Sequence, residues 1–282
     1  MDSNNLKEMA TQVRRDIVRM VHKVQSGHPG GSLGCADFIT ALYFKIMERK
    51  AGFDMDGIGE DIFFLSNGHI SPVFYSVLAR SGYFPISELS TFRHINSRLQ
   101  GHPATHEHLP GVRIASGSLG QGMSVACGAA LAKKMNKDAH IIYTLHGDGE
   151  LQEGNSWEAI LLAGKYKLHN LVAVVDYNNI QIEGYIENVM PLAPLAEKWR
   201  SFNWNVIEID GHNFRAIDEA FEQAKEVFEK PTVILARTIP GKGVGFMEHD
   251  FHWHGMPPNA EQAKKALEEL RTLGGKIKSE HQ

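Results

Sequence analysis

Short apolar runs that alternate with amphipathic segments predict an α/β fold for this chain. Ile141 to Leu145 and Leu171 to Asp176 are continuous apolar runs rich in β-branched residues, which is typical of strands buried on both faces of a parallel sheet. Between them, Glu153 to Tyr166 has the mixed polarity of a helix. Together the three segments predict a βαβ unit, in which both strands end at the same edge of the sheet.

The same periodicities predict one α/β domain over residues 1–258, a mostly parallel sheet flanked by helices. Further strands are expected at Asp61 to Leu65, Asn205 to Ile209 and Thr232 to Arg237, and further helices at Leu6 to Val24, Cys35 to Met47, a segment ending at Ala79, a segment within 117–132, and Asn213 to Phe228. Residues 81–118 are rich in Pro, Gly and His, so we expect loops and short helices there. Residues 259–282 are expected to form a charged helix, ending near Gly274-Gly275, and a tail.

Composition narrows the class of protein. The chain has 282 residues, 43% of them hydrophobic, and a formal net charge of −4, without the strong basic run that nucleic acid or an anionic membrane would require. Its apolar stretches are broken well before the roughly 20 residues that span a bilayer, and its N-terminus lacks the apolar core of a signal peptide. Cys35 and Cys127 have no metal-ligand spacing and are expected to be buried thiols. These observations favour a cytoplasmic protein with no nucleic-acid or membrane partner.

Oxygen side chains follow both strands of the predicted βαβ unit. Asp148 lies within Gly147-Asp148-Gly149 after the first strand, and Asn178 follows the second strand about thirty residues later. A small hard cation such as Mg²⁺ prefers oxygen ligands and takes few protein groups together with phosphate oxygens. The glycines and the start of the next helix favour close approach of an anion. The sequence therefore predicts a metal-bound diphosphate here; the alternative is a plain turn in which Asp148 caps a helix.

Several ordered motifs resemble those of the transketolase family. They are Ser26-Gly27-His28-Pro29-Gly30-Gly31, Ser66-Asn67-Gly68-His69, Gly101-His102-Pro103, Gly117-Ser118-Leu119-Gly120-Gln121-Gly122 and Trp253-His254-Gly255, and the Asp148 to Asn178 spacing resembles the thiamine diphosphate motif. The resemblance covers roughly residues 10 to 258. It implies a thiamine diphosphate-binding fold, corresponding to the N-terminal, diphosphate-binding part of a transketolase.

The resemblance also implies roles for the matching residues. Asp148, Asn178 and the main-chain carbonyl of Ile180 would ligate the metal, which would be Mg²⁺ or another divalent cation such as Ca²⁺ or Mn²⁺. His28, His69, His102 and His254 would be catalytic residues above the reactive ring of the cofactor, with imidazole pKa values near neutrality. The predicted cofactor contacts are His69, Gly117, Leu119, Asp148, Gly149, Glu153, Asn178, Ile180 and His254. Glu153 would hold a cleft arginine or a water network, or would simply be a carboxylate at a helix N-terminus. The other histidines are expected to be structural or solvated.

A full transketolase continues into a pyrimidine-binding domain, which supplies an activating glutamate, and a C-terminal domain. The resemblance stops before both, so it implies a split enzyme in which a second chain carries these domains in a heterotetramer of two plus two chains. The assembled enzyme would transfer a two-carbon ketol unit from a ketose phosphate to an aldose phosphate, and this chain would be active only with its partner. The alternatives are another thiamine diphosphate ketol or acyl transferase, such as a deoxyxylulose phosphate synthase relative or a transketolase for an unusual sugar, and a non-catalytic cofactor-binding subunit.

Overall fold

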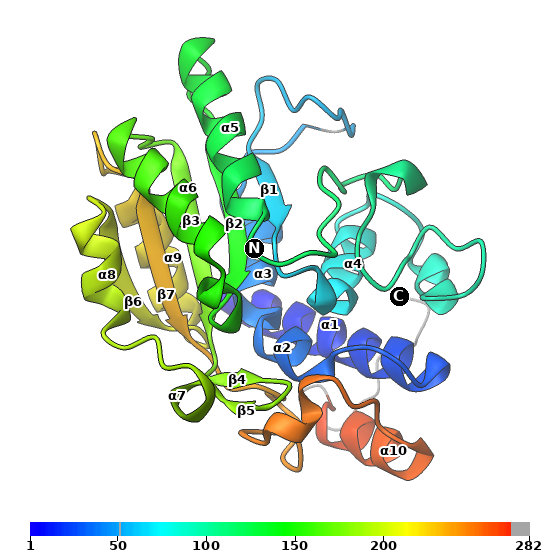
Figure 1. Ribbon diagram of the computed structural model, residues 1–282. Helices are drawn as coiled ribbons and strands as arrows, with labels where there is room; N and C mark the ends of the chain where they lie inside the picture. Colours follow the sequence, from blue (N-terminus) through cyan, green and yellow to red (C-terminus); the bar gives the residue numbers. More distant parts are fainter. Residues whose placement is uncertain (51, 272–282) are drawn as a thin grey trace.

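A five-stranded parallel sheet forms the centre of the protein. The computed structural model describes residues 1–50 and 52–271. The strands are β1 (Ile62–Leu65), β2 (Ile142–Gly147), β3 (Leu171–Tyr177), β7 (Thr232–Arg237) and β6 (Asn205–Asp210), in this spatial order, and each neighbouring pair is parallel (Figure 1). A separate antiparallel pair, β4 (Ile180–Gln181) and β5 (Gly184–Tyr185), follows β3. The predicted mostly parallel sheet and its βαβ unit are confirmed.

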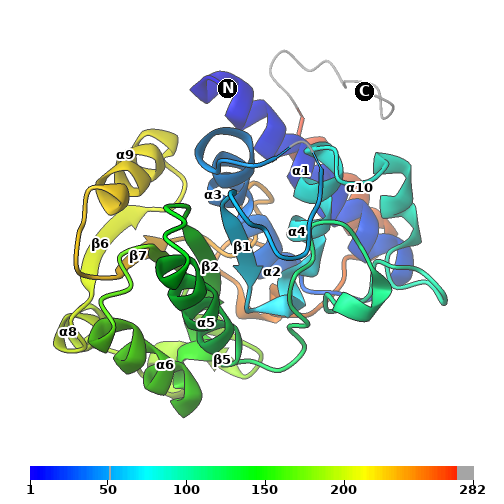
Figure 2. The same ribbon diagram turned by 90° about the horizontal axis from the view of Figure 1, so that it is seen from above.

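Helices cover both faces of the sheet, because alternate residues of each strand point to opposite sides. Tyr143 and Val172 pack into one core with α1 (Ser3–Val24), α3 (Ala36–Ala41), α4 (Ser71–Arg80), α9 (Phe214–Lys225) and α10 (Ala260–Glu269). Ile142 and Ala173 pack into the other core with α5 (Gly122–Met135), α6 (Gly154–Lys165) and α8 (Leu195–Ser201). Figure 2 shows the two layers, with α5 and α6 side by side on one face and α1 and α9 on the other.

The remaining elements are short. They are α2 (Pro29–Gly34), α7 (Ile186–Val189), a π-helical turn η1 (Leu42–Ile46) and the 3₁₀ turns η2 (Gly68–Ile70), η3 (Ile86–Thr91), η4 (Thr105–Glu107), η5 (Gly149–Gln152) and η6 (Phe251–His254). The segment 81–118 thus contains only loops and 3₁₀ turns, as predicted. Among residues 1–50 and 52–271, no helix combines the length and the apolar character needed to cross a membrane.

One helix prediction was confirmed to within a residue at each end, and another was wrong at its end. The helix expected from Cys35 to Met47 is observed as α3, which begins at Ala36, followed by the wider turn η1, in which the N–H of Met47 bonds to Leu42 O. The separate short helix α2, whose first turn is pre-set by Pro29, was not predicted. α10 ends at Glu269, earlier than expected, and Gly274-Gly275 lies outside the described residues. α10 packs on α1 and shares its core through Ala263, Ala266 and Leu270. Cys35 and Cys127 are buried free thiols, as predicted.

Candidate active site at the carboxyl edge of the sheet

Asp148 and Asn178 meet where β2 and β3 end. Gly147 of β2 is paired in register with Asp176 of β3, so the residues that follow both strands emerge at one edge. Asp148 is 1% exposed, and its carboxylate accepts hydrogen bonds from the main-chain N–H of Gly149 at 2.9 Å and of Asn179 at 2.6 Å. These bonds fix the Asp148 carboxylate against the turn that carries Asn178, as the βαβ prediction required.

Asp176 orients the Asn178 side chain. Asn178 Nδ2 donates to Asp176 Oδ2 at 2.7 Å, and the N–H of Ile180 donates to Asn178 Oδ1 at 2.9 Å. Asp176 is itself held by a very short hydrogen bond from the Thr238 hydroxyl. Sequence reasoning placed Asp176 only at the end of a buried strand and missed this role; a carboxylate inside an otherwise apolar run was the signal available.

The electrostatics of this corner favour a cation. Burial, followed by the neighbouring charge of Asp176, raises the pKa of Asp148 well above its ordinary value, against the opposing effect of two main-chain N–H groups. Burial also raises the pKa of Asp176. Asp148, Asn178 and the carbonyl of the buried residue Ile180 offer only oxygen donors, which suit a hard divalent cation. Within the described ranges, no group of three or more His, Cys, Asp or Glu side chains lies where it could hold a metal ion.

Four histidines from four separate segments form one cluster. His28 precedes α2, His69 lies in η2, His102 lies in the loop before η4, and His254 ends η6. The ring of His28 lies 5.0 Å from that of His69, 5.6 Å from that of His254 and 6.5 Å from that of His102, centre to centre. The Nδ1 atoms of His28 and His254 are buried without a hydrogen-bond partner in the described chain. Buried polar atoms without a partner indicate a binding site for a ligand that would supply the missing hydrogen bonds.

The cluster is held in its uncharged form. Burial, then the neighbouring His254, Arg93 and His102, lowers the pKa of His28 to about 4. Burial also lowers the pKa of His69, His102 and His254 below the ordinary value, that of His69 by a wide margin. The near-neutral pKa values expected from sequence are therefore wrong for this structure. Each neutral ring presents one donor and one acceptor, and the negative charge of a bound diphosphate would raise these pKa values again.

The loop before α5 forms another wall of the site. Gly117 and Leu119 line it, and Gly120, at φ +79°, packs so closely that a Cβ there would lie 2.7 Å from Glu153 Cβ. Glu153 has an exposed side chain and forms no ion pair with an arginine of residues 1–50 and 52–271, so the arginine or water contact weighed for it from sequence stays a prediction. The turn η5 separates Gly149 from the first turn of α6, which starts at Gly154, within one residue of the predicted start.

A buried carboxylate that sequence reasoning missed holds this loop to the turn that follows β2. Glu150, 2% exposed, accepts a hydrogen bond from the N–H of Gly120 at 2.9 Å and a very short one from the hydroxyl of Ser66. His146 Nδ1 lies 3.3 Å from its other oxygen. Burial alone would raise the pKa of Glu150, but His146 and these hydrogen bonds outweigh it and lower the pKa. The structural role expected for His146 is thus observed.

All the residues predicted for the site line one cavity of about 460 Å³ at this edge of the sheet. The cavity brings together His28, His69, His102, Gly117, Leu119, Asp148, Gly149, Glu153, Asn178, Ile180 and His254. Asn67, Gln152, Gln181 and Glu183 also line it and were not predicted as site residues. Asn67 lay in a recognised motif, and its buried Oδ1 has no partner within residues 1–50 and 52–271. The arrangement offers an oxygen-rich corner for a metal and anion beside a wall of neutral imidazoles.

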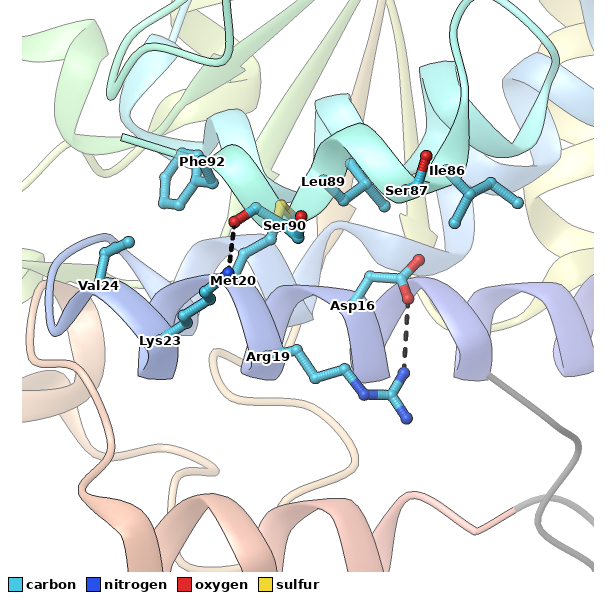
Figure 3. A pocket seen from close by; sticks show the side chains of 10 residues that line it. All are labelled: Asp16, Arg19, Met20, Lys23, Val24, Ile86, Ser87, Leu89, Ser90 and Phe92. Atoms are coloured by element: carbon cyan, nitrogen blue, oxygen red, sulfur yellow. Dashed lines mark hydrogen bonds and ion pairs between the residues drawn. The ribbon is translucent and has the colours of Figure 1, made fainter. Parts of the chain in front are cut away.

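A larger cavity, of about 570 Å³, lies between α1 and η3 (Figure 3). It contains none of the predicted site residues. Asp16 at its edge is engaged by Arg80 at 2.6 Å, and Lys23 Nζ donates to the carbonyl of Ser90 at 2.8 Å. Its polar groups therefore serve to join α1 to α4 and η3, and we assign the site to the smaller cavity because the chemically active groups converge there.

Comparison with known proteins agrees with this geometry. Residues 6–274 match the family described as transketolase, thiamine diphosphate binding domain. The chain is 41% identical to a 6-deoxy-6-sulfo-D-fructose transketolase subunit of Clostridium sp. (strain MSTE9), over 96% of this chain and 98% of that protein. It is 37% identical to one of the subunits of apulose-4-phosphate transketolase from Actinobacillus succinogenes, over 95% of this chain and 96% of that protein.

A solved structure has the same fold. The crystal structure of transketolase from Campylobacter jejuni matches 96% of this chain with a TM-score of 0.88 and 36% identity, but the match covers only 43% of that longer chain. The two subunit relatives, by contrast, are matched over nearly their whole length. The family match, the subunit relatives and the shared fold together show that this chain belongs to the transketolase family, as a thiamine diphosphate-binding subunit.

Proposed function

We propose that this protein is the diphosphate-binding subunit of a two-chain transketolase, which moves a two-carbon ketol unit from a ketose phosphate to an aldose phosphate. The observation that carries the proposal is the convergence of every predicted site residue on one cavity at the carboxyl edge of the sheet. Thiamine diphosphate, when bound, supplies the carbon nucleophile that accepts and releases the two-carbon unit. The residues of this chain bind, orient and hydrogen-bond the reacting partners.

Asp148, Asn178 and the carbonyl of Ile180 would hold the divalent cation, and through it the diphosphate. Three observations support this assignment: the donors are all oxygen, Asp148 is fixed by two main-chain N–H groups, and Asn178 is oriented by Asp176. Burial raises the pKa values of Asp148 and Asp176. A bound cation would therefore be favourable here, because its positive charge would relieve the repulsion between the two buried carboxylates. Mg²⁺ is the first candidate, with Ca²⁺ and Mn²⁺ as alternatives.

The four histidines would bind the sugar part of the substrate. Neutral imidazole can donate to a carbonyl or alkoxide oxygen and accept from a hydroxyl, which suits a polyhydroxylated ketose. The unpartnered Nδ1 atoms of His28 and His254 lie in the cluster beside the oxygen-rich corner. His69 and His254 would also lie near the diphosphate, and Gly117, Leu119, Gly149 and Glu153 would line the rest of the cofactor site.

A second chain would complete the site. Exposed apolar side chains lie along α5 and α6, where Leu161 is 57% exposed and Met135, the last residue of α5, is 75% exposed. Val125, Leu162 and Tyr166 are also exposed there, and we call these five side chains the α5–α6 face. α5 starts directly after the loop of Gly117 and Leu119, so a chain docked there would reach the cofactor. We propose a partner that carries pyrimidine-binding and C-terminal domains, in a heterotetramer of two plus two chains.

The substrates and the compartment are proposed more broadly. Two sugars named in the subunit relatives, 6-deoxy-6-sulfo-D-fructose and apulose 4-phosphate, should be tested as substrates together with ordinary ketose phosphates. Two buried, unpaired thiols, Cys35 and Cys127, support a reducing compartment such as the cytoplasm.

Reconstitution tests the proposed function. The chain and its partner are purified separately, loaded with thiamine diphosphate and Mg²⁺, and assayed with panels of ketose and aldose phosphates. We expect ketol transfer by the mixture and none by either chain alone. Full transfer by this chain alone would refute the two-chain proposal, and cofactor binding without transfer to any sugar by the complex would favour a non-catalytic subunit.

A further inference from the structure

Arg93 is a cation without an acidic partner. Within residues 1–50 and 52–271 no acceptor is found for its guanidinium, and its Nε is buried without a hydrogen bond. Arg98, in the same loop, is held by both oxygens of Glu88 at 2.9 and 2.8 Å. The guanidinium lies 5.5 Å from the centre of the Phe92 ring, but this contact supplies no negative charge to balance a partly buried cation, so its position calls for an explanation outside simple ion pairing.

The backbone places the Arg93 side chain against the residue that precedes His102. Arg93 has φ +57°, which is uncommon for a residue with a side chain, and its N–H donates to Leu99 O at 2.8 Å. The guanidinium packs on Gly101, where a Cβ would lie 2.5 Å from Arg93 Cζ. On its other side Gly101 O accepts a 2.7 Å hydrogen bond from the hydroxyl of Ser71 in α4. The backbone leading into His102 is therefore held between α4 and Arg93.

We propose that Arg93 is a positioning residue of the histidine cluster: it fixes the Gly101-His102 backbone and places a positive charge behind His102 and His28, so that both rings stay uncharged for hydrogen bonding to the sugar. The inference rests on the proposed function in one respect: the sugar is the expected ligand of the imidazole rings. The position of Arg93 behind Gly101 and its lack of an acidic partner do not depend on that function.

The charges around the cluster support this role. Burial is the main cause that lowers the pKa of His102, and the charge of Arg93 adds to it. For His28, burial acts first, followed by His254, Arg93 and His102. A protonated ring would be repelled by a fixed cation, whereas a neutral ring can donate and accept hydrogen bonds.

The other titratable groups that face these residues are few. The ring of His69 lies beside His28 at 5.0 Å. Tyr75 of α4 faces Arg93, and Glu107 of η4 faces Tyr75 in turn. Glu183, after β4, acts on His254. None of these carboxylates pairs with Arg93 in the described chain, so its charge is not cancelled nearby.

The test separates charge from packing. Arg93→Met removes the charge and keeps most of the bulk, Arg93→Lys keeps the charge without the planar group, and Arg98→Met is the matched control in the same loop. Ring-proton titrations of His102 and His28 are followed by NMR in the full chain, with assignments from His102→Asn and His28→Asn. In the reconstituted enzyme, kcat/KM is measured as a function of pH for Arg93→Met, Arg93→Lys and Arg98→Met, and the midpoint of its acid limb is determined.

We expect Arg93→Met to raise the pKa of His102 and His28 and to move the acid limb upward by roughly half to one pH unit. Arg93→Lys should restore the titration, and Arg98→Met should not change it. Unchanged titrations in a folded Arg93→Met chain would overturn the proposal. So would failure of both Arg93→Met and Arg93→Gln to fold, because Arg93 would then be a stability residue. The NMR titration needs no catalysis, so its outcome stands even if the proposed reaction fails.

Discussion

The main-chain N–H of Asn179 donates a 2.6 Å hydrogen bond to Asp148 Oδ2, which ties the turn after β3 to the turn after β2. Two segments distant in sequence thereby become one rigid corner, with the carboxylate of Asp148 aimed by the turn that carries Asn178. The geometry makes Asp148 the residue on which metal binding depends most directly.

Replacing Asp148 by Ala should abolish metal-dependent binding of thiamine diphosphate. Loss of the carboxylate removes a charged ligand, so affinity should fall by more than the ~10–100-fold seen when only an outer partner of a metal ligand is lost. Isothermal titration calorimetry with and without Mg²⁺ measures the change. Asp218→Ala, on the exposed side of α9, is the control and should bind normally. Unchanged affinity in the Asp148 variant would remove the metal assignment.

His102 should matter for turnover more than for cofactor binding. It lies at the exposed rim of the histidine cluster, 6.5 Å from His28 between ring centres. Replacing His102 by Asn should lower kcat/KM by on the order of 10²-fold, because a positioned hydrogen-bonding group is lost, and should leave cofactor affinity nearly unchanged. His106→Asn is the control, since His106 is an exposed histidine of η4, the turn that follows this loop. A large loss of cofactor affinity in the His102 variant would argue against this division of roles.

Acid should destabilise the folded chain through His28. Its pKa is about 4 when folded, against an ordinary value of 6.5, so between these values the unfolded chain binds the proton and the folded chain does not. The stability present above pH 6.5 is therefore lost as the pH falls toward 4, by at most ~1.4 kcal/mol per pH unit for one proton.

Urea unfolding at a series of pH values measures this effect. We expect the free energy of unfolding to fall less steeply with acid in His28→Asn than in the wild type, and as steeply in the control His252→Gln, whose ring is exposed. An identical pH dependence in the His28 variant would show that the burial of this ring does not set its protonation.

The α5–α6 face should bind the second chain. Replacing Leu161, which is 57% exposed on α6, by Asp would place a charge in the proposed interface and should weaken partner binding by roughly ten-fold or more. Phe228→Asp is the matched control, because Phe228 is 75% exposed beyond the end of α9 and outside that face. Retention of the partner is measured by pull-down and by mass photometry. Equal loss in both variants, or in neither, would place the interface elsewhere.

Local pattern and spacing predicted the parts of the site that depend on the strands. The apolar runs located the ends of β2 and β3 to within two residues, and parallel pairing then brought Asp148 and Asn178 to one edge without further information. The protonation of the histidines could not be predicted in this way. The lowered pKa of His28 depends on burial and on His254, which is more than two hundred residues away in sequence.

The hydrogen bonds that orient the site residues could not be predicted from the sequence either. Asp176 orients Asn178 only because Thr238, just past the end of β7, holds it by a short hydrogen bond. Glu150 holds the loops of the site together because it accepts hydrogen bonds from Ser66 and Gly120, which come from two other segments. The π-helical turn at Leu42–Ile46 could not be predicted either, because so short a segment leaves no periodic signal.

The most direct test is purification of this chain from its native host in the presence of thiamine diphosphate and Mg²⁺, with mass spectrometry of whatever co-purifies in equal amount. We predict a stoichiometric second chain that carries the pyrimidine-binding and C-terminal domains, and ketol transfer by that complex. A homodimer of this chain that alone transfers a two-carbon unit would contradict the account.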